Sequence, residues 1–511
     1  MSDWTEGYVA EIPYTFGYYS ELNPLRLAAP FLNVALAPPA IATACELGFG
    51  QGISANIHAA ATDTRWYGTD FNPAHAAFAQ SLAAASGAHA RLFDQSFGEF
   101  CGRAELPDFD FIGLHGIWSW VSEQNQNVIV DFVRRKLKPG GVLYISYNTQ
   151  PGHAAMVPLR HLLATHAEIM APPGNSMVAK IDAAIEFTER LLALNPLFAL
   201  AHPSLGERFA ALKGHDRHYL AHEYFNHDWR AVPFAEMAQR LAPAKLTFAC
   251  SAHYPDHIDA LNLSPEQQRF VAEIPDPVFR QELRDFIINQ QFRRDYWVKG
   301  GIRLSPFEQA EAVRRLKLML LSDPRDVEFT VQGAAGQREL NTGVYRPILD
   351  VLADRRAKTI GEIEAAVKGP DPQLGTIFEA VMVLIGKGDL APVQDDDEQA
   401  RAKPHTDKFN LLMQEKARGS GDLPHLATPV TGGGVAVTRF LLLFLLARRQ
   451  GSETPEELAR VAWDILGPQG HRLVKDGERL ESAEANLAEL VTQATDFIDK
   501  RLPVLQALQV A

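Results

Sequence analysis

The chain of 511 residues is long enough for about three domains. Hydrophobic residues make up 46% of it and charged residues 22%, an ordinary globular composition that excludes a disordered or collagen-like chain. The net charge of -13 disfavours long-range attraction to nucleic acid or to an anionic membrane.

The cysteines and the apolar segments predict a soluble, cytoplasmic protein. Cys45, Cys101 and Cys250 lie far apart, in neither a disulfide framework nor a zinc-ligand spacing. Residues 1–14 lack the basic and apolar segments of a secretory leader. The longest apolar run, residues 440–447, is too short for a membrane-spanning helix, which needs about 20 residues. We expect this run to form one buried helix and no membrane insertion.

The first 150 residues alternate strand-like and helix-like runs. Strands are predicted at residues 41–47, 66–70, 90–93, 109–114 and 142–147, and helices at residues 53–61, 73–86 and 127–137. This alternation predicts an α/β fold with a doubly wound, mostly parallel sheet that helices cover on both faces.

The middle of the chain is predicted to be mainly helical. Residues 152–215 form a helical insertion that is broken at residues 172–175, and strand-like runs at 218–225 and 245–252 are candidates to complete the sheet. Further on, helices are predicted at residues 265–294 and 305–321, and a hairpin at residues 327–340.

Residues 301–395 are predicted to contain a winged-helix-like arrangement. Helices at 345–353, 360–367 and 373–385 precede a short strand that follows Gly388. The third helix has almost no basic side chains, which favours a protein contact or a regulatory role over DNA binding. The acidic residues 395–398 are predicted to be a solvated linker, and residues 400–511 a helical C-terminal domain.

A glycine-rich segment between the first strand and the first helix carries the chemistry. Glu46 is followed by Gly48, Gly50 and Gly52, which allow a tight turn and the close approach of a ligand. The spacing differs from the dinucleotide pattern G-x-G-x-x-G, because residue 53 is isoleucine, and the Lys-Ser/Thr of a phosphate loop is missing. An acid at this loop would repel a pyrophosphate and attract a cation.

The pattern E-x-G-x-G-x-G resembles motif I of the class I S-adenosylmethionine-dependent methyltransferases. This resemblance implies S-adenosyl-L-methionine as the cofactor and a seven-stranded sheet. It also implies that Asp70, followed by Phe71, accepts hydrogen bonds from the ribose hydroxyls at the end of the second strand. Asp94 or Gln95 would lie near the adenine after the third strand, and residues 138–141 look like the family's turn before the fifth strand.

Further stretches resemble bacterial methyltransferases that carry a methyltransferase regulatory domain, a group that includes rickettsial protein lysine methyltransferases. These stretches are residues 11–14, 23–27, 115–121, 146–152, 222–229 and 284–300. The resemblance implies a methyltransferase domain at residues 1–255 and an overlapping regulatory region at residues 218–300. It covers residues 300–511 only loosely.

Aromatic and polar side chains after the fourth strand are candidates to contact the methyl acceptor, because ligands bind beyond the carboxyl ends of such strands. The candidates are His115, Trp118, Trp120, Tyr14, Tyr147 and Asn148. His115 or Tyr14 would hold or deprotonate the acceptor, and His115 would also touch the cofactor. The tryptophans would either stabilise a cation or simply bury apolar area under the insertion. The N-P-P-Y loop of many amine and nucleobase methyltransferases is absent after the fourth strand, where H-G-I-W stands instead, and this disfavours nucleobase methylation.

Four histidines, at positions 215, 218, 222 and 227, lack the H-E-x-x-H spacing, and we expect no metal site. His222 and Glu223 are instead candidates to line the acceptor channel. The sequence predicts a methyltransferase, and the family resemblance alone implies that its acceptor is a protein side chain such as lysine. Two alternatives stay open: a catalytically silent regulatory protein with this fold, and a methyltransferase of small molecules or glycans.

Overall fold

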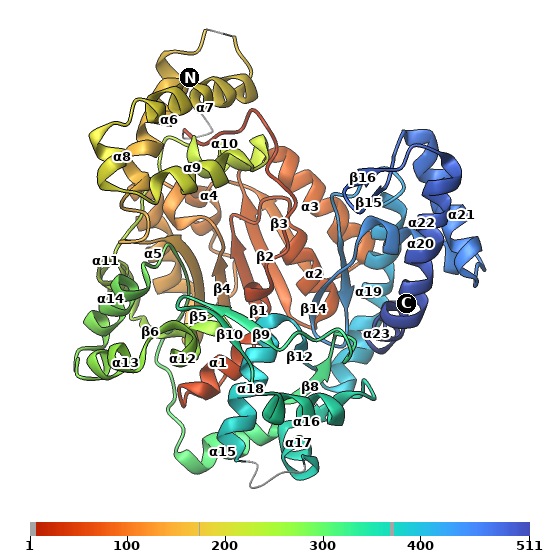
Figure 1. Ribbon diagram of the computed structural model, residues 1–511. Coiled ribbons are helices and arrows are strands. Elements are labelled where there is room, and N and C mark those ends of the chain that lie inside the picture. The colour runs from red at the N-terminus through yellow and green to blue at the C-terminus, as the bar shows by residue number, and fades with distance from the viewer. Residues whose placement is uncertain (1–6, 173, 368–372) are drawn as a thin grey trace.

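A seven-stranded sheet forms the centre of the computed structural model, which describes residues 7–172, 174–367 and 373–511 (Figure 1). The strand order is β3-β2-β1-β4-β5-β7-β6, and only β7 runs antiparallel to its neighbours. The strands are β1 (Thr43–Leu47), β2 (Arg65–Asp70), β3 (Ala90–Asp94), β4 (Phe109–Leu114), β5 (Leu137–Asn148), β6 (Thr247–Ser251) and β7 (Phe292–Val298). The predicted doubly wound, mostly parallel sheet is confirmed.

Helices cover both faces of the sheet because the side chains of successive strand residues point to opposite faces. On one face, α1 (Ala28–Asn33), α2 (Ile53–Ala61) and α3 (Pro73–Ser86) pack against a core that contains Trp66 and Phe111. On the other face, α4 (Phe97–Cys101), α5 (Glu123–Lys136) and α11 (Phe234–Leu241) pack against a core that contains Tyr67 and Ile112.

A helical insertion lies beside the top of the sheet in the view of Figure 1. Its helices are α6 (Met156–Ile169), α7 (Met177–Ala193), α8 (Leu197–Ala201), α9 (Leu205–Lys213) and α10 (Arg217–Tyr224). The prediction of a strand at residues 218–225 is wrong. The side chain of Asp216 accepts hydrogen bonds from the backbone N–H groups of His218 and Tyr219 and thereby starts a helix. Within the predicted break at residues 172–175, Pro173 lies outside the described residues.

The helix predicted at residues 265–294 ends earlier, and its last three residues begin the strand β7. Helix α14 (Pro277–Ile288) ends at Asn289, which has a φ of 52°, and β7 begins three residues later. β7 pairs with both β5 and β6, so the sheet runs to Val298, and its end lies within the regulatory region expected at residues 218–300. The remaining helices of this region are α12 (Asp259–Asn262) and α13 (Pro265–Ala272).

Residues 301–395 combine helices with a small sheet of order β11-β8-β12. The elements are α15 (Pro306–Arg315), β8 (Lys317–Leu320), β9 (Thr330–Gly333), β10 (Gly336–Glu339), α16 (Thr342–Leu352), β11 (Lys358–Thr359), α17 (Ile360–Ala366), α18 (Leu374–Lys387) and β12 (Leu390–Pro392). The hairpin and the three winged-helix-like helices are confirmed. A single helix over residues 305–321 is wrong, because β8 pairs with β12 and turns the end of that segment into a strand.

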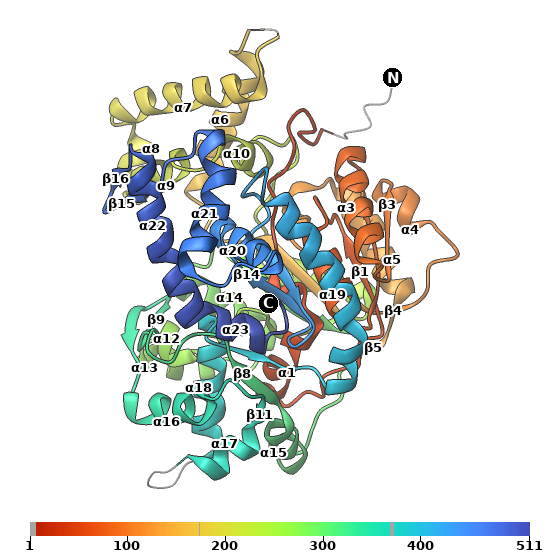
Figure 2. The same ribbon diagram turned by 90° about the vertical axis from the view of Figure 1, so that its right-hand side faces the viewer.

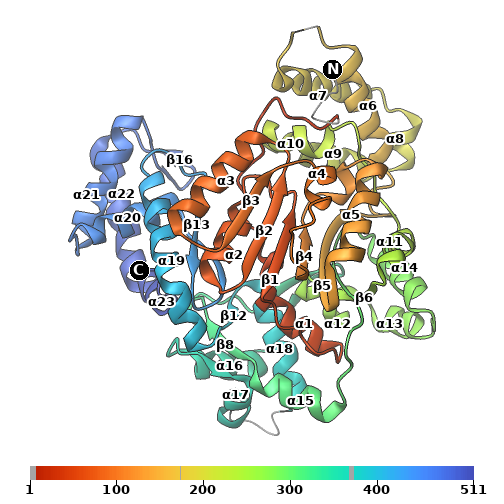
Figure 3. The same ribbon diagram turned by 180° about the vertical axis from the view of Figure 1, so that it is seen from behind.

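The C-terminal unit, residues 396–511, packs against α2 and α3 at the side of the sheet (Figures 2 and 3). It consists of α19 (Asp396–Lys416), β13 (His425–Thr428), β14 (Gly433–Ala436), α20 (Arg439–Arg449), α21 (Pro455–Leu466), β15 (Val474–Lys475), β16 (Glu478–Arg479), α22 (Ala483–Asp496) and α23 (Leu502–Ala507). The predicted acidic linker is instead the start of α19, where negative side chains are favourable. Helix α20 is the expected buried apolar helix. Among the described residues, no helix is long and apolar enough to cross a membrane.

Candidate active site

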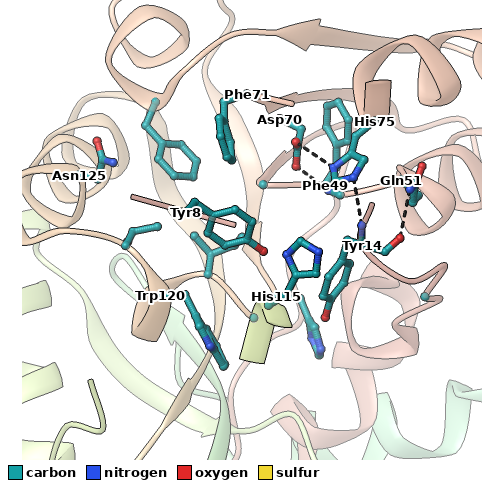
Figure 4. A pocket seen from close by; sticks show the side chains of 18 of the residues that line it. Tyr8, Tyr14, Phe49, Gln51, Asp70, Phe71, His75, His115, Trp120 and Asn125 are labelled. Atoms are coloured by element: carbon teal, nitrogen blue, oxygen red, sulfur yellow. Dashed lines mark hydrogen bonds and ion pairs between the residues drawn. The ribbon is translucent and has the colours of Figure 1, made fainter. Parts of the chain in front are cut away.

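The glycine loop between β1 and α2 borders a cavity at the carboxyl ends of the strands (Figure 4). Gly48, Gly50 and Gly52 have φ angles of 73°, 57° and 70°, which strain any other L-residue. Gly48 and Gly50 line the cavity, but Gly52 does not. A Cβ atom on Gly52 would lie 2.5 Å from Cβ of Ala79. Gly52 therefore allows α2 to pack closely against α3 and is not in contact with the cavity.

Asp70, the last residue of β2, fastens this loop at the edge of the cavity. Its Oδ2 atom accepts a hydrogen bond from the backbone N–H of Gly50 at 2.8 Å, and Oδ1 accepts one from Asn72 N–H at 3.0 Å. Nδ1 of His75 lies 3.3 Å from the same Oδ1 (Figure 4). An ionised carboxylate has about four acceptor positions, so Asp70 retains capacity for a ligand in the cavity.

His75 connects Asp70 to the N-terminal segment. Its Nε2 accepts a hydrogen bond from the backbone N–H of Tyr14 at 3.3 Å, which assigns the proton to Nδ1 on the Asp70 side. Gln51 binds the same residue of the N-terminal segment, because its Nε2 donates a hydrogen bond to the backbone carbonyl of Tyr14 at 3.1 Å. Sequence reasoning missed His75, although it lies in the first turn of the helix that follows Asp70.

Glu46 lies on β1 beneath the loop and is not among the residues that line the cavity. The residue is 2% exposed, and its Oε2 has no hydrogen-bond partner among the described residues. Burial, reinforced by the negative charge of Asp70, raises the pKa of Glu46 to about 8. An unpartnered buried carboxyl group at this place suits a site that receives a positively charged ligand.

The side of the cavity next to β3 is formed by Gln95 rather than by Asp94. Asp94 ends β3 with an exposed side chain, whereas Gln95 and Phe97 line the cavity. The alternation of side chains at the strand end turns Asp94 towards solvent. Phe71 also lines the cavity and meets the ring of Tyr8 edge-on, with centroids 5.5 Å apart. These residues give the cavity an aromatic wall with one amide group.

His115 and Trp120 line the opposite side. Nδ1 of His115 lies 2.7 Å from the hydroxyl oxygen of Tyr144, and the imidazole stacks on Tyr19 with centroids 3.6 Å apart. Burial lowers the pKa of His115 to about 4, so the ring is neutral at pH 7. The indole N–H of Trp120 donates to the carbonyl of Glu223 at 3.1 Å.

Three predicted residues lie away from the cavity. Trp118 packs in the core beneath α5, because residues 118–120 form a 3-10 turn in which neighbouring side chains point in different directions. Tyr147 faces the other side of β5 and donates to Oδ2 of Asp295 at 2.8 Å. The backbone of Asn148 pairs with Ser119 and Val232, and its buried side chain does not line the cavity.

An extended segment of residues 14–19, here called the strap, covers the cavity together with α10. Tyr14 and Tyr19 from the strap, Tyr8, and Glu223 from α10 all line the cavity. Burial raises the pKa of Glu223 to about 7, and a hydrogen bond with Tyr14 opposes this shift. Sequence reasoning did not single out Tyr8 or Tyr19, since nothing local distinguishes them from other tyrosines.

The histidines of α10 bind the N-terminal segment. Nε2 of His222 lies 3.1 Å from the carbonyl oxygen of Ile12, and Nδ1 of His218 lies 3.2 Å from that of Pro13. Within the described parts of the chain, no group of three metal-ligating side chains comes together.

The charged side chains that line the cavity are all acidic. They are Asp70, Glu223 and Asp228, and none of the described lining residues is lysine or arginine. The cavity therefore favours cations over anions. The sheet order, the glycine loop and this acidic cavity define a class I S-adenosylmethionine-dependent methyltransferase.

Comparisons with known proteins give the family. Residues 44–141 match the model of a methyltransferase domain, and residues 216–299 match that of a predicted methyltransferase regulatory domain. The protein sll1526 of Synechocystis sp. is 38% identical over 99% of this chain and 100% of its own length. RP789 of Rickettsia prowazekii is 24% identical over 96% of this chain and 92% of its own length. This chain belongs to the same family as sll1526, the S-adenosylmethionine-dependent methyltransferases that carry a regulatory domain.

A solved structure shares the fold over nearly the whole length. PKMT2 from Rickettsia typhi, in complex with AdoHcy, covers 95% of this chain and 98% of its own with a TM-score of 0.68 and 16% identity. The arrangement of sheet, insertion and C-terminal unit is thus shared, and the cofactor of this enzyme is S-adenosyl-L-methionine.

Proposed function

We propose that this enzyme binds a protonated alkylamine and methylates its nitrogen after one proton has been removed, and that this amine is a lysine side chain of a protein. The observation that carries this proposal is the wall of the cavity, which combines Tyr8, Tyr14 and Tyr19 with Glu223 and has no lysine or arginine among its described residues. Aromatic faces and carboxylates stabilise an ammonium group. An anionic acceptor such as a carboxylate or a phosphate would be repelled. The resemblance to rickettsial protein lysine methyltransferases supports the same acceptor.

The residues around the glycine loop are suited to hold the cofactor. Asp70 would accept hydrogen bonds from the ribose hydroxyls, while Gln95 and Phe71 would lie beside the adenine. The backbone of Gly48 and Gly50 would lie against the methionine part, and the buried Glu46, which does not line the cavity, would act from beneath the loop. When bound, the cofactor supplies an activated methyl group on a sulfonium, which is a good leaving group.

Glu223 would prepare the acceptor amine. A lysine ammonium group has an ordinary pKa of about 10.4 and must lose a proton before its nitrogen can attack. The Glu223 carboxylate would bind the ammonium, accept one proton on a carboxylate oxygen and leave the nitrogen lone pair free. Burial makes Glu223 a stronger base than an exposed carboxylate, because it raises the pKa of this group to about 7.

Orientation and exclusion of water would come from the aromatic residues. Tyr19 and the neutral His115 are stacked at 3.6 Å and form a rigid wall, while Tyr14 is fixed by His75 and Gln51. Holding an amine in line with a methyl group at near-attack distance accounts for much of the rate enhancement that such a reaction needs.

Methylation of a cell lysate from the source organism, with the purified enzyme and cofactor labelled in the methyl group, tests the proposal. We expect label in protein, and mass spectrometry should place it on lysine side chains. Label found only in small molecules or glycans would show that one of these, and not lysine, is the acceptor. Cofactor binding without any methyl transfer would indicate a catalytically silent protein. A Gly50→Trp variant that remains folded is the control, because its side chain would occupy the cofactor cavity.

A further inference from the structure

The strap lies between the cofactor cavity and the C-terminal unit. Gly17 and Tyr19 line the cavity, whereas Phe16 and Tyr18 face the C-terminal unit on the opposite side. Phe16 meets the ring of Phe78 edge-on at 5.3 Å and borders a small crevice with Met413, Leu423 and His425. Successive residues of the strap therefore contact two different parts of the molecule.

Tyr18 is held by the hairpin of β13 and β14. Its hydroxyl oxygen accepts a hydrogen bond from the backbone N–H of Gly434 at 2.7 Å. Its ring lies between those of His58 and His425, with centroids 5.3 Å and 5.1 Å away. Burial raises the pKa of Tyr18 to about 12, so the hydroxyl is neutral.

Two glycines of the hairpin make this contact possible. A Cβ atom on Gly433 would lie 2.7 Å from the Tyr18 hydroxyl oxygen, and one on Gly434 would lie 2.8 Å from Cζ of the ring. Any larger residue at either position would push the tyrosine, and with it the strap. This close approach gives a physical reason for glycine at positions 433 and 434.

Two further hydrogen bonds hold the chain near Tyr18, one to the hairpin and one to α2. Nδ2 of Asn23 donates to the carbonyl of Thr431 at 3.1 Å, and the backbone N–H of Tyr19 donates to Oγ of Ser54 at 2.9 Å. The chain is thus fixed immediately before, at and after the residue that stacks on His115.

The hairpin itself is anchored independently of the strap. Nε2 of Gln394 donates to the carbonyl of Ala61 at the end of α2 at 2.8 Å and to that of Pro429 at 2.7 Å. Asn410 of α19 exchanges two 2.8 Å hydrogen bonds with the backbone of Ala427. The hairpin can therefore act as a fixed support for the strap.

We infer that the hairpin of the C-terminal unit positions the wall of the active site by holding Tyr18, which makes Tyr18 a positioning residue and the C-terminal unit a part of the cofactor site. Displacement of Tyr18 would shift Tyr19 from His115 and loosen the cover of the cavity. Cofactor affinity would fall even though no residue of the C-terminal unit borders the cavity.

The test compares three variants of the full-length enzyme. Tyr18→Phe removes only the hydroxyl, and Gly434→Ala pushes on the ring. The control Asn486→Ala removes hydrogen bonds to the backbone of Leu473, Leu480 and Ser482 within the C-terminal unit, away from the hairpin and the strap. For each variant, the affinity for S-adenosylhomocysteine is measured by calorimetry, KM for the cofactor by kinetics, and Tm by thermal unfolding.

We expect affinity to fall about five- to tenfold in Tyr18→Phe and further in Gly434→Ala, with KM for the cofactor raised in parallel. Asn486→Ala should lower Tm and leave affinity unchanged. Wild-type affinity for S-adenosylhomocysteine in both Tyr18→Phe and Gly434→Ala would overturn the inference. Equal loss of affinity in all three variants would also overturn it, since general destabilisation would then explain the effect. Neither result depends on the identity of the acceptor.

Discussion

The carboxylate of Asp70 accepts a hydrogen bond from the backbone N–H of Gly50 at 2.8 Å, which ties the glycine loop after β1 to the end of β2 at the edge of the cofactor cavity. The same carboxylate contacts His75, and His75 in turn accepts the backbone N–H of Tyr14. One side chain therefore organises the glycine loop, the first turn of α3 and the strap. A change at Asp70 should affect the shape of the site as well as its contact with ribose.

Replacement of Asp70 by alanine should weaken the binding of S-adenosylhomocysteine by more than about tenfold. The glycine loop and the bound ligand would both lose the carboxylate that accepts their hydrogen bonds. Asp70→Asn keeps one acceptor oxygen and should weaken the binding of S-adenosylhomocysteine less than Asp70→Ala does. Calorimetric titration of both variants provides the measurement.

A matched control exists at the other end of the sheet. Oδ2 of Asp110 also accepts backbone N–H groups, those of Ala42 and Thr43, at 3.1 Å and 3.0 Å. Asp110→Asn should lower Tm without a change in cofactor affinity. An equal loss of affinity for S-adenosylhomocysteine in Asp70→Asn and Asp110→Asn would contradict the assignment of Asp70 to the cofactor site.

The elements around the glycine loop could be predicted from the sequence because their signals are local. Asn72 caps α3 ahead of Pro73, and α2 and α3 have the predicted bounds of residues 53–61 and 73–86. The strands β7 and β8, which were not predicted, depend on distant partners. β7 becomes a strand because β5 and β6 lie on either side of it, and neither partner is near it in the sequence.

The candidate site could be predicted only in part for the same reason. Sequence order places a polar residue after β3, but the choice between Asp94 and Gln95 depends on how the chain leaves the strand. His222 and Glu223 were predicted to line the acceptor channel, and both line the cavity, whereas Tyr8 and Tyr19 were not predicted and reach it only because the N-terminal segment lies over the ends of the strands. Such contacts follow from tertiary packing, which no local pattern encodes.

Gly50 and Gly52 should respond differently to replacement by alanine. Both have positive φ, but a Cβ atom on Gly50 would approach nothing closer than the Tyr14 ring at 3.6 Å, whereas one on Gly52 would collide with Ala79 at 2.5 Å. Gly52→Ala should cost about 1–3 kcal/mol of unfolding free energy. Gly50→Ala should mainly reduce cofactor affinity.

Chemical denaturation and calorimetry separate the two effects. The double variant Gly52→Ala with Ala79→Gly should recover part of the lost stability, because the collision is relieved while the backbone strain remains. No recovery would show that helix packing is not the reason for glycine at position 52.

Glu46→Gln should stabilise the ligand-free enzyme at neutral pH and weaken cofactor binding. The pKa of Glu46 is raised by burial to about 8, above its value of 4.5 in the unfolded chain. Between these values the native state binds more protons than the unfolded state, so Glu46 makes stability fall as pH rises. The glutamine has no charge to bury, and Tm should rise by a few degrees at pH 7 and depend less on pH. Thermal unfolding between pH 5 and pH 8 gives the measurement, and a lower Tm in the variant would contradict it.

Glu223→Gln should separate binding from catalysis. The amide cannot accept the proton of an ammonium group, so kcat should fall by about a hundredfold while affinity for S-adenosylhomocysteine changes little.

In the wild-type enzyme, Glu223 must be ionised to act as a base, and its pKa is raised by burial to about 7. The rate should therefore increase with pH through this value and level off above it. In the glutamine variant this step should be missing from the profile of kcat against pH. A profile that keeps the step would assign the base to another group, and Asp228→Asn is the matched variant that tests the other acidic residue on the same wall.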